Sequence, residues 1–511
     1  MIFSLLFLCL NLSTLFRFSS AGGAALQNYN QSDYDDSIYG RSGRRLYAAN
    51  DFKISEEDYN AMLEKLAQGY MSNSDLERAM QEFNSRCPNI SRVYSIGKSV
   101  LGVPLLAIEI SDSPGNMDAK PSFKFVGNVH GNEPVGRELL LMLANWLCDN
   151  YLKDSLVTTI VDGVHLHILP SMNPDGYAQR RRNNANHIDL NRDFPDQFFP
   201  VNDDMDLRQP ETKAMLNWME DIHFTASATL HGGALVANYP WDGTEDKRRD
   251  YFGCPDDKTF RFLASLYSRS HYNMSLSKEF PDGITNGAFW YPIYGGMQDW
   301  NYIHSGCFEL TLEISDNKWP DASELPTIWD HNRMSMLNLV GSVIKFAESY
   351  SVSCAIQTGI HGRVLSSDGI PLPALIDIWG INYTITAGKK FGEYYRLLAP
   401  GEKYEVIASM PGYRSKRACV ILGEGAVTVD FVLDPETSST HSESRVLEDY
   451  AGCYYDSKPS LQVIDFLPVT QLEISVLLFV MLGLLCFLMQ RRARRNQKQM
   501  HVSLPRRAAV V

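Results

Sequence analysis

The middle of the chain alternates between short apolar runs and segments in which apolar residues recur every three or four positions. The first pattern is typical of buried strands, and the second is typical of helices that cover a sheet. Apolar runs predict strands at residues 123–129, 165–169, 226–230 and 308–314, after a strand pair within residues 93–110. The helical pattern occurs at residues 59–83, directly after the strand at 123–129, around 211–219 and at 330–350. This alternation predicts an α/β domain over residues 56–352, with helices on both faces of its sheet.

The pattern changes after this domain. Residues 358–433 show no helical period, and turn signals such as Ser367-Asp368-Gly369 and Pro411-Gly412 separate short segments. The last of these segments, from Val427 to Leu433, alternates between apolar and polar positions, as a strand with one buried face does. We therefore expect a small all-β sandwich over residues 353–436.

The amino-terminal end begins with an apolar run over residues 2–16, which small residues follow. This pattern predicts a signal peptide at residues 1–24, although no Lys or Arg precedes the apolar run. Residues 25–55 are polar and aperiodic, so we expect a flexible segment. Arg44-Arg45 within it suggests a propeptide cleavage site, and a charged pair in a loose segment explains these residues equally well.

The carboxyl-terminal end contains a second long apolar run. A polar stalk at residues 437–468 leads into a predicted transmembrane helix at residues 469–490. A basic tail at residues 491–511 follows, with seven Lys or Arg and no acidic residue. The tail argues against a buried core helix and against a lipid-anchor signal, which would end in its apolar part. We expect a single-pass type I protein of the secretory or endomembrane system or the plasma membrane, with a lumenal or extracellular catalytic domain.

Net charge and cysteine content agree with this interpretation. The chain carries a net charge of −13, so the part before the basic tail carries −20. That acidity argues against nucleic-acid binding and is compatible with cationic substrates. Of nine Cys, seven lie outside the predicted signal peptide and membrane span, and none forms a C-x-x-C pair. Disulfides are therefore expected rather than a Cys-based metal site. Sequons for N-glycosylation begin at Asn30, Asn89, Asn273 and Asn382.

Candidate metal ligands follow two of the predicted strands. His130 and Glu133 stand three positions apart after the strand at 123–129 and could point at one zinc ion. Alone this pair is a weak signal, because a loop His and a Glu that caps the next helix would look the same. His231 directly follows another strand and is a better third ligand than His165 or His167, which alternate with apolar residues. Two His and one Glu leave a fourth position for water, as in catalytic zinc sites.

Two further groups of charged residues are candidates for chemistry. Glu309 and Glu313 lie on the same face of the strand at 308–314, where a carboxylate is costly unless it has partners or lines a wet cleft. Either could be the general base, and the alternation does not choose between them. Arg180-Arg181-Arg182 and Asp189-Leu190-Asn191-Arg192 offer cations for a carboxylate or an oxyanion. A solvated basic loop is the alternative.

Several ordered motifs together resemble the zinc metallocarboxypeptidases, and within them the regulatory group of carboxypeptidases D, E, M and N. The motifs are His130-Gly-Asn-Glu133-Pro, Ser171-Met-Asn-Pro-Asp-Gly176, Ile188-Asp-Leu-Asn-Arg-Asp-Phe-Pro195, Leu230-His-Gly-Gly-Ala-Leu-Val-Ala-Asn-Tyr-Pro240, Gly295-Gly-Met-Gln-Asp299 and Cys307-Phe-Glu-Leu-Thr-Leu-Glu313. The resemblance extends from about Tyr59 to Leu433. It is strongest to the single-unit, membrane-anchored carboxypeptidase D-like enzymes, including those of plants. It implies a mixed sheet covered by helices, followed by a transthyretin-like β-sandwich.

The resemblance also implies a metal site and a mechanism. His130, Glu133 and His231 would bind one Zn²⁺ in the catalytic domain. Glu313, rather than Glu309, would be the general base that takes a proton from water and gives it to the leaving amine. Arg182 would polarise the scissile carbonyl and stabilise the oxyanion.

Substrate binding follows from the same resemblance. Asn191 and Arg192 would hold the terminal carboxylate of a peptide, and Tyr291 would close on it. Asp242 and Gln298 would line the pocket for a basic last side chain, because a buried acid selects Lys or Arg by charge.

The implied activity is the removal of C-terminal Arg or Lys from peptides and processed proproteins. One alternative is a catalytically inactive relative that binds peptides or partners, but no ligand, base or clamp residue is missing. A second alternative is a zinc deacylase of N-acyl amino acids, against which Tyr291, Asp242 and the appended β-domain argue. We also hypothesise two disulfides, Cys254–Cys307 in the catalytic domain and Cys354–Cys419 in the sandwich.

Overall fold

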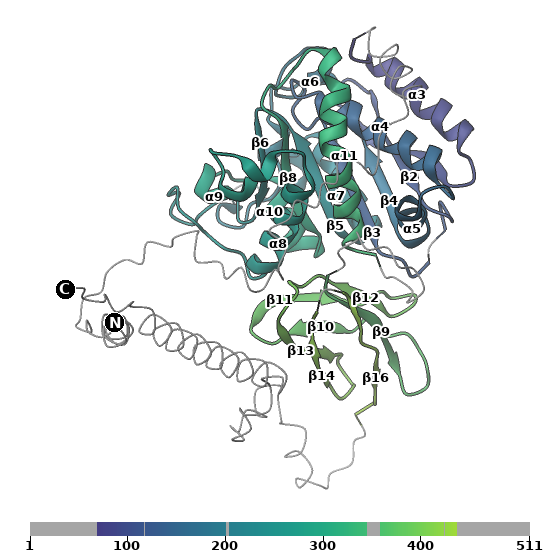
Figure 1. Cartoon of the computed structure of the whole chain (residues 1–511). Helices are drawn as coiled ribbons and strands as arrows, with labels where there is room; N and C mark the ends of the chain where they lie inside the picture. The colour runs from purple at the N-terminus through teal and green to yellow at the C-terminus, as the bar shows by residue number, and fades with distance from the viewer. Residues whose placement is uncertain (1–68, 117, 201–203, 345–357, 424, 437–511) are drawn as a thin grey trace, which may run out of the picture.

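A mixed sheet of eight strands forms the centre of the larger part of the molecule (Figure 1). The computed structural model describes residues 69–116, 118–200, 204–344, 358–423 and 425–436. The strand order is β1-β2-β4-β3-β5-β8-β6-β7. The strands are β1 (Ser91–Lys98), β2 (Pro104–Ile110), β3 (Ser122–Gly127), β4 (His165–Leu169), β5 (Phe224–His231), β6 (Ala234–Tyr239), β7 (Ile284–Asn286) and β8 (Phe308–Ser315).

The four apolar runs that predicted strands are the central strands β3, β4, β5 and β8. These strands are parallel to one another, whereas β2 and β6 join them in antiparallel pairs. Parallel strands inside a sheet are buried on both faces, and this accounts for their nearly continuous apolar sequence. The expected strand pair within residues 93–110 is also present, as β1 and β2.

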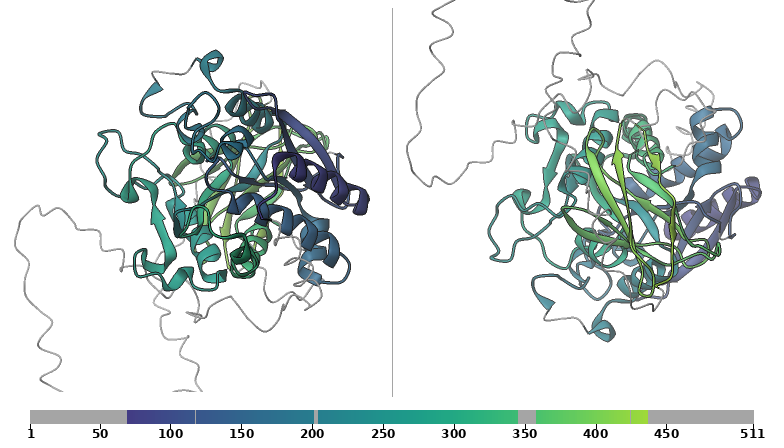
Figure 2. Two further views of the ribbon diagram at one scale, coloured as in Figure 1. Left: turned by 90° about the horizontal axis from the view of Figure 1, so that it is seen from above. Right: turned by 90° about the horizontal axis from the view of Figure 1, so that it is seen from below.

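Helices cover both faces of the sheet, as the alternating pattern predicts (Figures 1 and 2). On one face, the largest hydrophobic cluster joins the sheet to α3 (Asn73–Arg86), α4 (Val135–Asn150), α5 (Ser155–Gly163), α8 (Asp257–Ser270) and α11 (Leu325–Gly341). A second cluster packs α7 (Pro210–Asp221) and α10 (Met297–Ser305) against the sheet. Helix α11 begins five residues before the predicted position, with Pro326 in its first turn, where a missing backbone N–H costs nothing.

The ends of the parallel strands determine where a site can form. His231 at the end of β5 is the register partner of Glu313 on β8. Gly127, the last residue of the neighbouring β3, is opposite Leu230, so the loop that carries His130 leaves the sheet at the same edge. Loops at the carboxyl edge of an α/β sheet are the usual place for a ligand site.

Residues 358–436 form a separate β-rich part, as their turn-rich sequence predicts. One sheet has the order β11-β10-β13-β14; the other has the order β12-β9-β15, with β16 also paired to β9. The strands are β9 (Ile360–Ser366), β10 (Leu375–Ile378), β11 (Ile381–Thr386), β12 (Glu393–Arg396), β13 (Lys403–Ser409), β14 (Lys416–Ile421), β15 (Val427–Thr428) and β16 (Phe431–Leu433). Buried residues from both sheets, including Val364 and Val406, share one hydrophobic core.

The β-rich part lies below the larger part in Figure 1 and contacts it near Phe308, at the opposite end of β8 from Glu313 and its register partner His231. The guanidinium of Arg396 lies over the ring of Phe308, the first residue of β8. It also donates hydrogen bonds of 2.8 and 2.9 Å to the two carboxylate oxygens of Asp256, and both side chains are fully buried. Tyr302 of α10 donates to the same carboxylate at 2.6 Å and stacks on Tyr383 of β11.

Replacement of Arg396 by Leu is expected to lower the free energy of unfolding by about 3–5 kcal/mol, because it leaves the carboxylate of Asp256 buried without its cation. Denaturant unfolding of the purified protein measures this change. Lys258→Leu is the matched control, since Lys258 pairs with Glu402 at an exposed position. Its expected effect is below about 1 kcal/mol. Equal effects of the two substitutions would contradict the prediction.

The disulfide hypothesis needs correction. Cys254 and Cys307 are free, buried thiols. They belong to different hydrophobic clusters, Cys254 to the one that contains α8 and Cys307 to the one that contains α10. A disulfide instead joins Cys87, after α3, to Cys148 in α4. Cys419 is disulfide-bonded, and Cys354 lies outside the described residues.

The predicted signal peptide, the segment at 25–55, the stalk, the membrane span and the basic tail also lie outside the described residues. Among the helices that are described, none combines the length and apolar character that a membrane crossing requires.

Candidate active site

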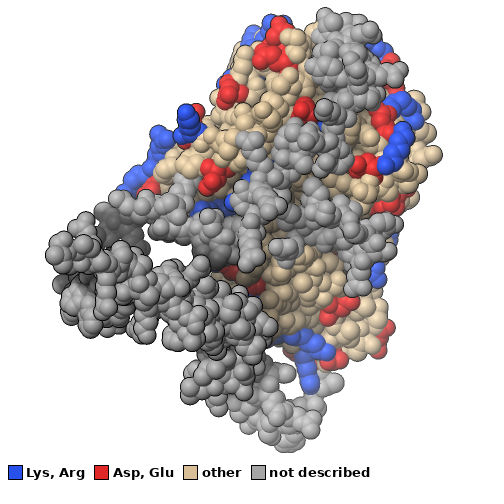
Figure 3. Space-filling view, viewed as in Figure 1, with Lys and Arg blue, Asp and Glu red and all other residues tan. Residues whose placement is uncertain are grey.

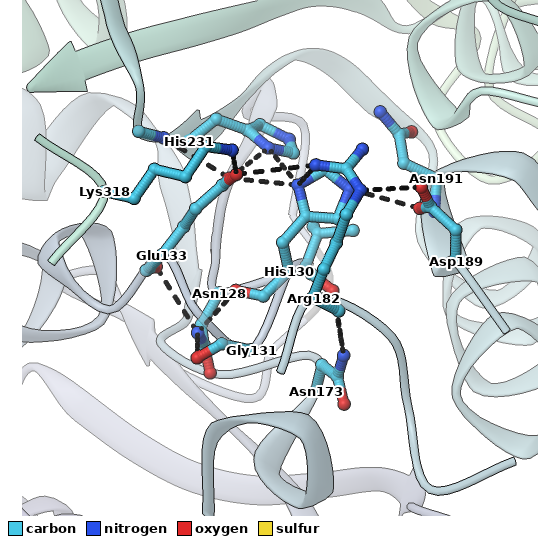
Figure 4. Close-up of polar contacts among 12 residues, drawn as sticks. Asn128, His130, Gly131, Glu133, Asn173, Arg182, Asp189, Asn191, His231 and Lys318 are labelled. Carbon is cyan, nitrogen blue, oxygen red and sulfur yellow. Dashed lines mark hydrogen bonds and ion pairs between the residues drawn. The ribbon is translucent and has the colours of Figure 1, made fainter. Parts of the chain in front are cut away.

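His130, Glu133 and His231 meet at the carboxyl edge of the sheet (Figure 4). Oε2 of Glu133 lies 2.9 Å from Nδ1 of His130 and 3.0 Å from Nδ1 of His231. The two Nδ1 atoms are only 3.1 Å apart, so at most one proton fits between them. All three side chains are buried. Three such donor atoms facing one point are the ligand set of a zinc ion, and the residues fit that metal.

A polar frame fixes the loop that carries His130 and Glu133. Asn128 has a left-handed backbone (φ 55°), which Asn tolerates better than most residues. Its side chain donates to the backbone oxygens of His130, Gly131 and Glu133. A Cβ on Gly131 would lie 2.0 Å from the backbone of Gly176, so only Gly allows the two loops to approach. The frame therefore presets both ligands before any metal binds.

Glu133 does not cap the helix that follows it. Helix α4 has no side-chain cap hydrogen bond at its start. The carboxylate of Glu133 instead accepts hydrogen bonds from Lys318 at 2.6 Å and from the backbone N–H of Gly232 at 3.3 Å, beside the two histidines. The alternative interpretation of His130 and Glu133 as a loop residue and a helix cap is therefore wrong.

Asp189 links the metal ligands to Arg182. One carboxylate oxygen lies 3.1 Å from Nε2 of His130, and the other accepts from Nε of Arg182 at 2.9 Å. Burial alone would raise the pKa of Asp189, but the hydrogen bond to His130 and the charge of Arg182 lower it below its usual range. The ionised carboxylate thus orients the ring of His130 and holds Arg182 beside the ligands.

The structure separates the two candidate bases on β8. Glu309 is fully buried and fully paired: it lies 2.9 Å from Nζ of Lys124 and accepts from the hydroxyls of Ser227 and Thr229 at 2.7 Å. The oxygen Oε2 of Glu313, in contrast, is buried without a hydrogen-bond partner. Burial, the largest influence, raises the pKa of Glu313 to about 7. Of the two, only Glu313 offers a free carboxylate oxygen beside the metal ligands.

One cavity joins the predicted site residues. It is lined by the three metal ligands and by Arg182, Asn191, Arg192, Asp242, Tyr291 and Glu313. Oδ1 of Asn191 accepts from the backbone N–H of Met297 at 2.9 Å, and Arg192 donates to the backbone oxygen of Asn191 at 2.6 Å. Tyr291 is 45% exposed, so it lines the cavity and also faces solvent.

A sequence profile of the zinc carboxypeptidases matches residues 76–335, about half of the chain. The chain belongs to the zinc carboxypeptidases. It is 63% identical over 444 residues to carboxypeptidase SOL1 of Arabidopsis thaliana, with 87% of each chain covered. It is 42% identical to human carboxypeptidase D over 73% of this chain and 27% of that protein. It is 40% identical to the catalytic chain of rat carboxypeptidase N, with 72% and 86% covered. These relatives confirm the regulatory group that the motifs indicated.

A buried acid also lines the cavity of this carboxypeptidase. Asp242 is 2% exposed, and its Oδ1 accepts hydrogen bonds of 3.0 Å from Nδ2 of Asn238 and from Nε2 of Gln298. Its Oδ2 is buried with no hydrogen-bond partner. Burial raises the pKa of Asp242 to about 6, against the lowering effect of Asn238. One carboxylate oxygen is thus held in place and the other is left for a ligand.

Gln298 differs from its expected position. It does not line the cavity but lies behind Asp242 and accepts from the backbone N–H of Thr311 at 2.7 Å. Gln298 therefore links the carboxylate of Asp242 to the backbone of β8. A Cβ on Gly287 would lie 2.1 Å from Oδ1 of Asp242, so this glycine leaves the room that the acid needs.

Sequence analysis missed four contributors to the site of this carboxypeptidase: Asp189, Asn238, Gly287 and Lys318. Asp189 and Asn238 lie inside the motifs at residues 188–195 and 230–240, and this position in the sequence is the signal that could identify them. Lys318 lies in the loop after β8, five residues beyond Glu313, and no spacing rule connects it to Glu133. Its contact with Glu133 spans 185 positions of the chain and is visible only in three dimensions.

Proposed function

We propose that this zinc carboxypeptidase removes C-terminal Arg or Lys from peptides and processed proproteins. The observation that carries the proposal is the position of Asp242. Its unpaired, buried oxygen lies in the same cavity as the metal ligands and the guanidinium of Arg192. A buried carboxylate that lacks a cation favours a ligand that supplies one, and Arg192 favours a ligand with a free carboxylate. A basic C-terminal residue has both groups.

The proposed roles follow from this arrangement. Arg192 and Asn191 hold the terminal carboxylate, and Tyr291 closes on it from the cavity mouth. Glu313 takes a proton from the attacking water and returns it to the leaving amine, while the Arg182 guanidinium stabilises the oxyanion. Zinc, when bound, would acidify water and polarise the scissile carbonyl.

A set of three peptides tests the proposal and its alternatives. The peptides differ only at the end: a free Arg, a free Ala and an amidated Arg. Rapid release of free Arg from the first peptide is expected, with slow release from the second, none from the third, and loss of activity with a chelator. An inactive relative would cleave none of them, and a zinc deacylase would instead hydrolyse an N-acyl amino acid.

We propose further that the β-rich part is a transthyretin-like sandwich over residues 353–436, attached to a catalytic domain over residues 56–352. Support comes from two sheets around one core and from the contact of Arg396 with Asp256, at the edge of the central sheet away from the ligands. Its role is structural or in docking, because none of its described residues, 358–423 and 425–436, lines the cavity that contains the metal ligands.

We also propose that the protein is a single-pass type I protein of the secretory route or plasma membrane, with its catalytic domain lumenal or extracellular. The Cys87–Cys148 disulfide supports an oxidising compartment. The sequon residues Asn89, Asn273 and Asn382 are all exposed. Acidic and basic side chains of the described residues are interspersed on the face in Figure 3. Protease protection in sealed vesicles tests this placement.

A further inference from the structure

The two oxygens of the Glu133 carboxylate have different partners. Oε2 faces the Nδ1 atoms of His130 and His231, at 2.9 and 3.0 Å. Oε1 lies 2.6 Å from Nζ of Lys318 and 3.5 Å from Nη1 of Arg182 (Figure 4). Only one oxygen of this side chain is therefore directed at the two histidines, and Lys318 holds the other.

Gly233 makes room for the stem of Lys318. Gly233 has a left-handed backbone (φ 121°), and a Cβ there would lie 2.8 Å from Cε of Lys318. A Cβ on Gly232 would lie 3.5 Å from the Cα of Lys318, in ordinary contact. The backbone N–H of Gly233 donates to Ser315 at 2.7 Å, which ties this turn to the loop that carries Lys318. The residues that follow His231 thus form a channel for the lysine stem.

An aromatic bracket fixes the backbone of that loop. The ring of Trp319 stacks on Tyr177 with 7° between the planes, and Arg180 lies over it at 4.8 Å. Tyr70 meets the edge of Trp319 and donates from its hydroxyl to the backbone oxygen of Pro320 at 3.0 Å. Although the side chain of Lys318 is 46% exposed, its backbone is held from both sides.

We propose that Lys318 is a positioning residue of the metal site. By holding Oε1 of Glu133, it keeps Oε2 directed at the point that His130 and His231 face. The Glu133 side chain is then ordered before the metal binds, so binding costs little side-chain entropy. The inference rests on the proposed function only in taking these three residues as the zinc ligands. The charge of Lys318 also repels a dication, but solvent screens a half-exposed ammonium more than a buried carboxylate. We therefore expect the orienting effect to be the larger one, and the zinc constant of Lys318→Met decides between them.

The test compares zinc dissociation constants, measured on the metal-free full chain by competition with a chromogenic chelator. Lys318→Met is expected to weaken zinc binding by about 10-fold or more, as loss of a partner of a metal ligand does. Lys318→Arg, which keeps the charge and the donor, is expected to bind zinc within about threefold of wild type. Lys278→Met, at an exposed position, is the matched control and should not change the constant.

The thermal stability of the metal-free protein and its zinc constant together show whether Lys318 acts on the metal site or only on the fold. Lys318→Met removes the nearest cation of the buried Glu133 carboxylate, so the thermal midpoint of the metal-free variant should fall below that of wild type. A purely structural role would lower this midpoint and leave the zinc dissociation constant unchanged, so the zinc constant decides. If this variant does not fold, Lys318→Gln serves in its place. Zinc binding by Lys318→Met that equals or exceeds that of wild type would overturn the inference. Failure of the zinc-loaded wild type to cleave the Arg-ended peptide would instead overturn the proposed function, and the comparison of zinc constants would still decide the role of Lys318.

Discussion

Replacement of Glu313 by Gln is expected to lower kcat by about 10²–10⁴-fold while zinc remains bound, because general-base catalysis contributes factors of that size. Gln has nearly the same shape but accepts no proton at neutral pH. Oε2 of Glu313 is buried, lacks a partner and stands beside His231 in the strand register. His130, Glu133 and His231 would hold the metal, so the substitution would remove the proposed base and keep the proposed ligands. Rates with the Arg-ended peptide and zinc content of the purified variant are the two measurements.

The neighbouring Glu309 supplies the control. Glu309→Gln alters an equally buried carboxyl on the same strand face, but one that is paired with Lys124 and lies away from the cavity. We expect this variant to lose about 3–5 kcal/mol of stability, because the ammonium of Lys124 is left buried without its carboxylate. The folded fraction should keep its activity per molecule. Zinc loss in Glu313→Gln, or activity near that of wild type, would contradict the role given to Glu313.

The choice between these two glutamates illustrates what the sequence could predict and what it could not. Alternation along the strand places both carboxyls on one face, so the local pattern treats them as equivalent. Their difference arises from Lys124, which lies on β3 and meets Glu309 across 185 positions of the chain. The family motif identified Glu313 by analogy, and the physical reason for the choice appears only with the packing of β3, β5 and β8.

The same limit explains the other errors and omissions. The central strands are buried on both faces of the sheet, so their sequences are nearly continuously apolar and predicted them well. Strand β6 contains Asn238, and Gly232 and Gly233 lie directly before it. These residues serve the site, and they interrupt the apolar pattern that would predict a strand. The predicted disulfide between Cys254 and Cys307 is wrong. An oxidising compartment and the number of cysteines do not show on which face of the sheet each thiol packs. Lys318 could not be found because loops carry no periodicity.

Replacement of Asp242 by Asn is expected to remove the preference for a basic C-terminal residue. The Asn keeps the shape of the buried side chain but offers no negative charge to a guanidinium or ammonium. Loss of one member of a desolvated charge pair costs on the order of 2–5 kcal/mol, or about 30–5,000-fold in kcat/KM for the Arg-ended peptide. The Ala-ended peptide does not reach this charge, so its kcat/KM should change little. The ratio of the two values is the measurement.

The preference for a basic residue should also depend on pH in a defined direction. Burial raises the pKa of Asp242 to about 6, so the carboxyl carries its charge above that pH and loses it below. The Arg-to-Ala ratio of kcat/KM reports the free enzyme and should therefore fall as the pH drops through about 6. In Asp242→Asn the ratio should be low and independent of pH in this range. Asp246→Asn, at an exposed acid four residues away, should behave as wild type. A selectivity that Asp242→Asn leaves unchanged would refute the role of Asp242, because the other two acids that line the cavity, Glu133 and Glu313, are assigned to the metal and to the attacking water.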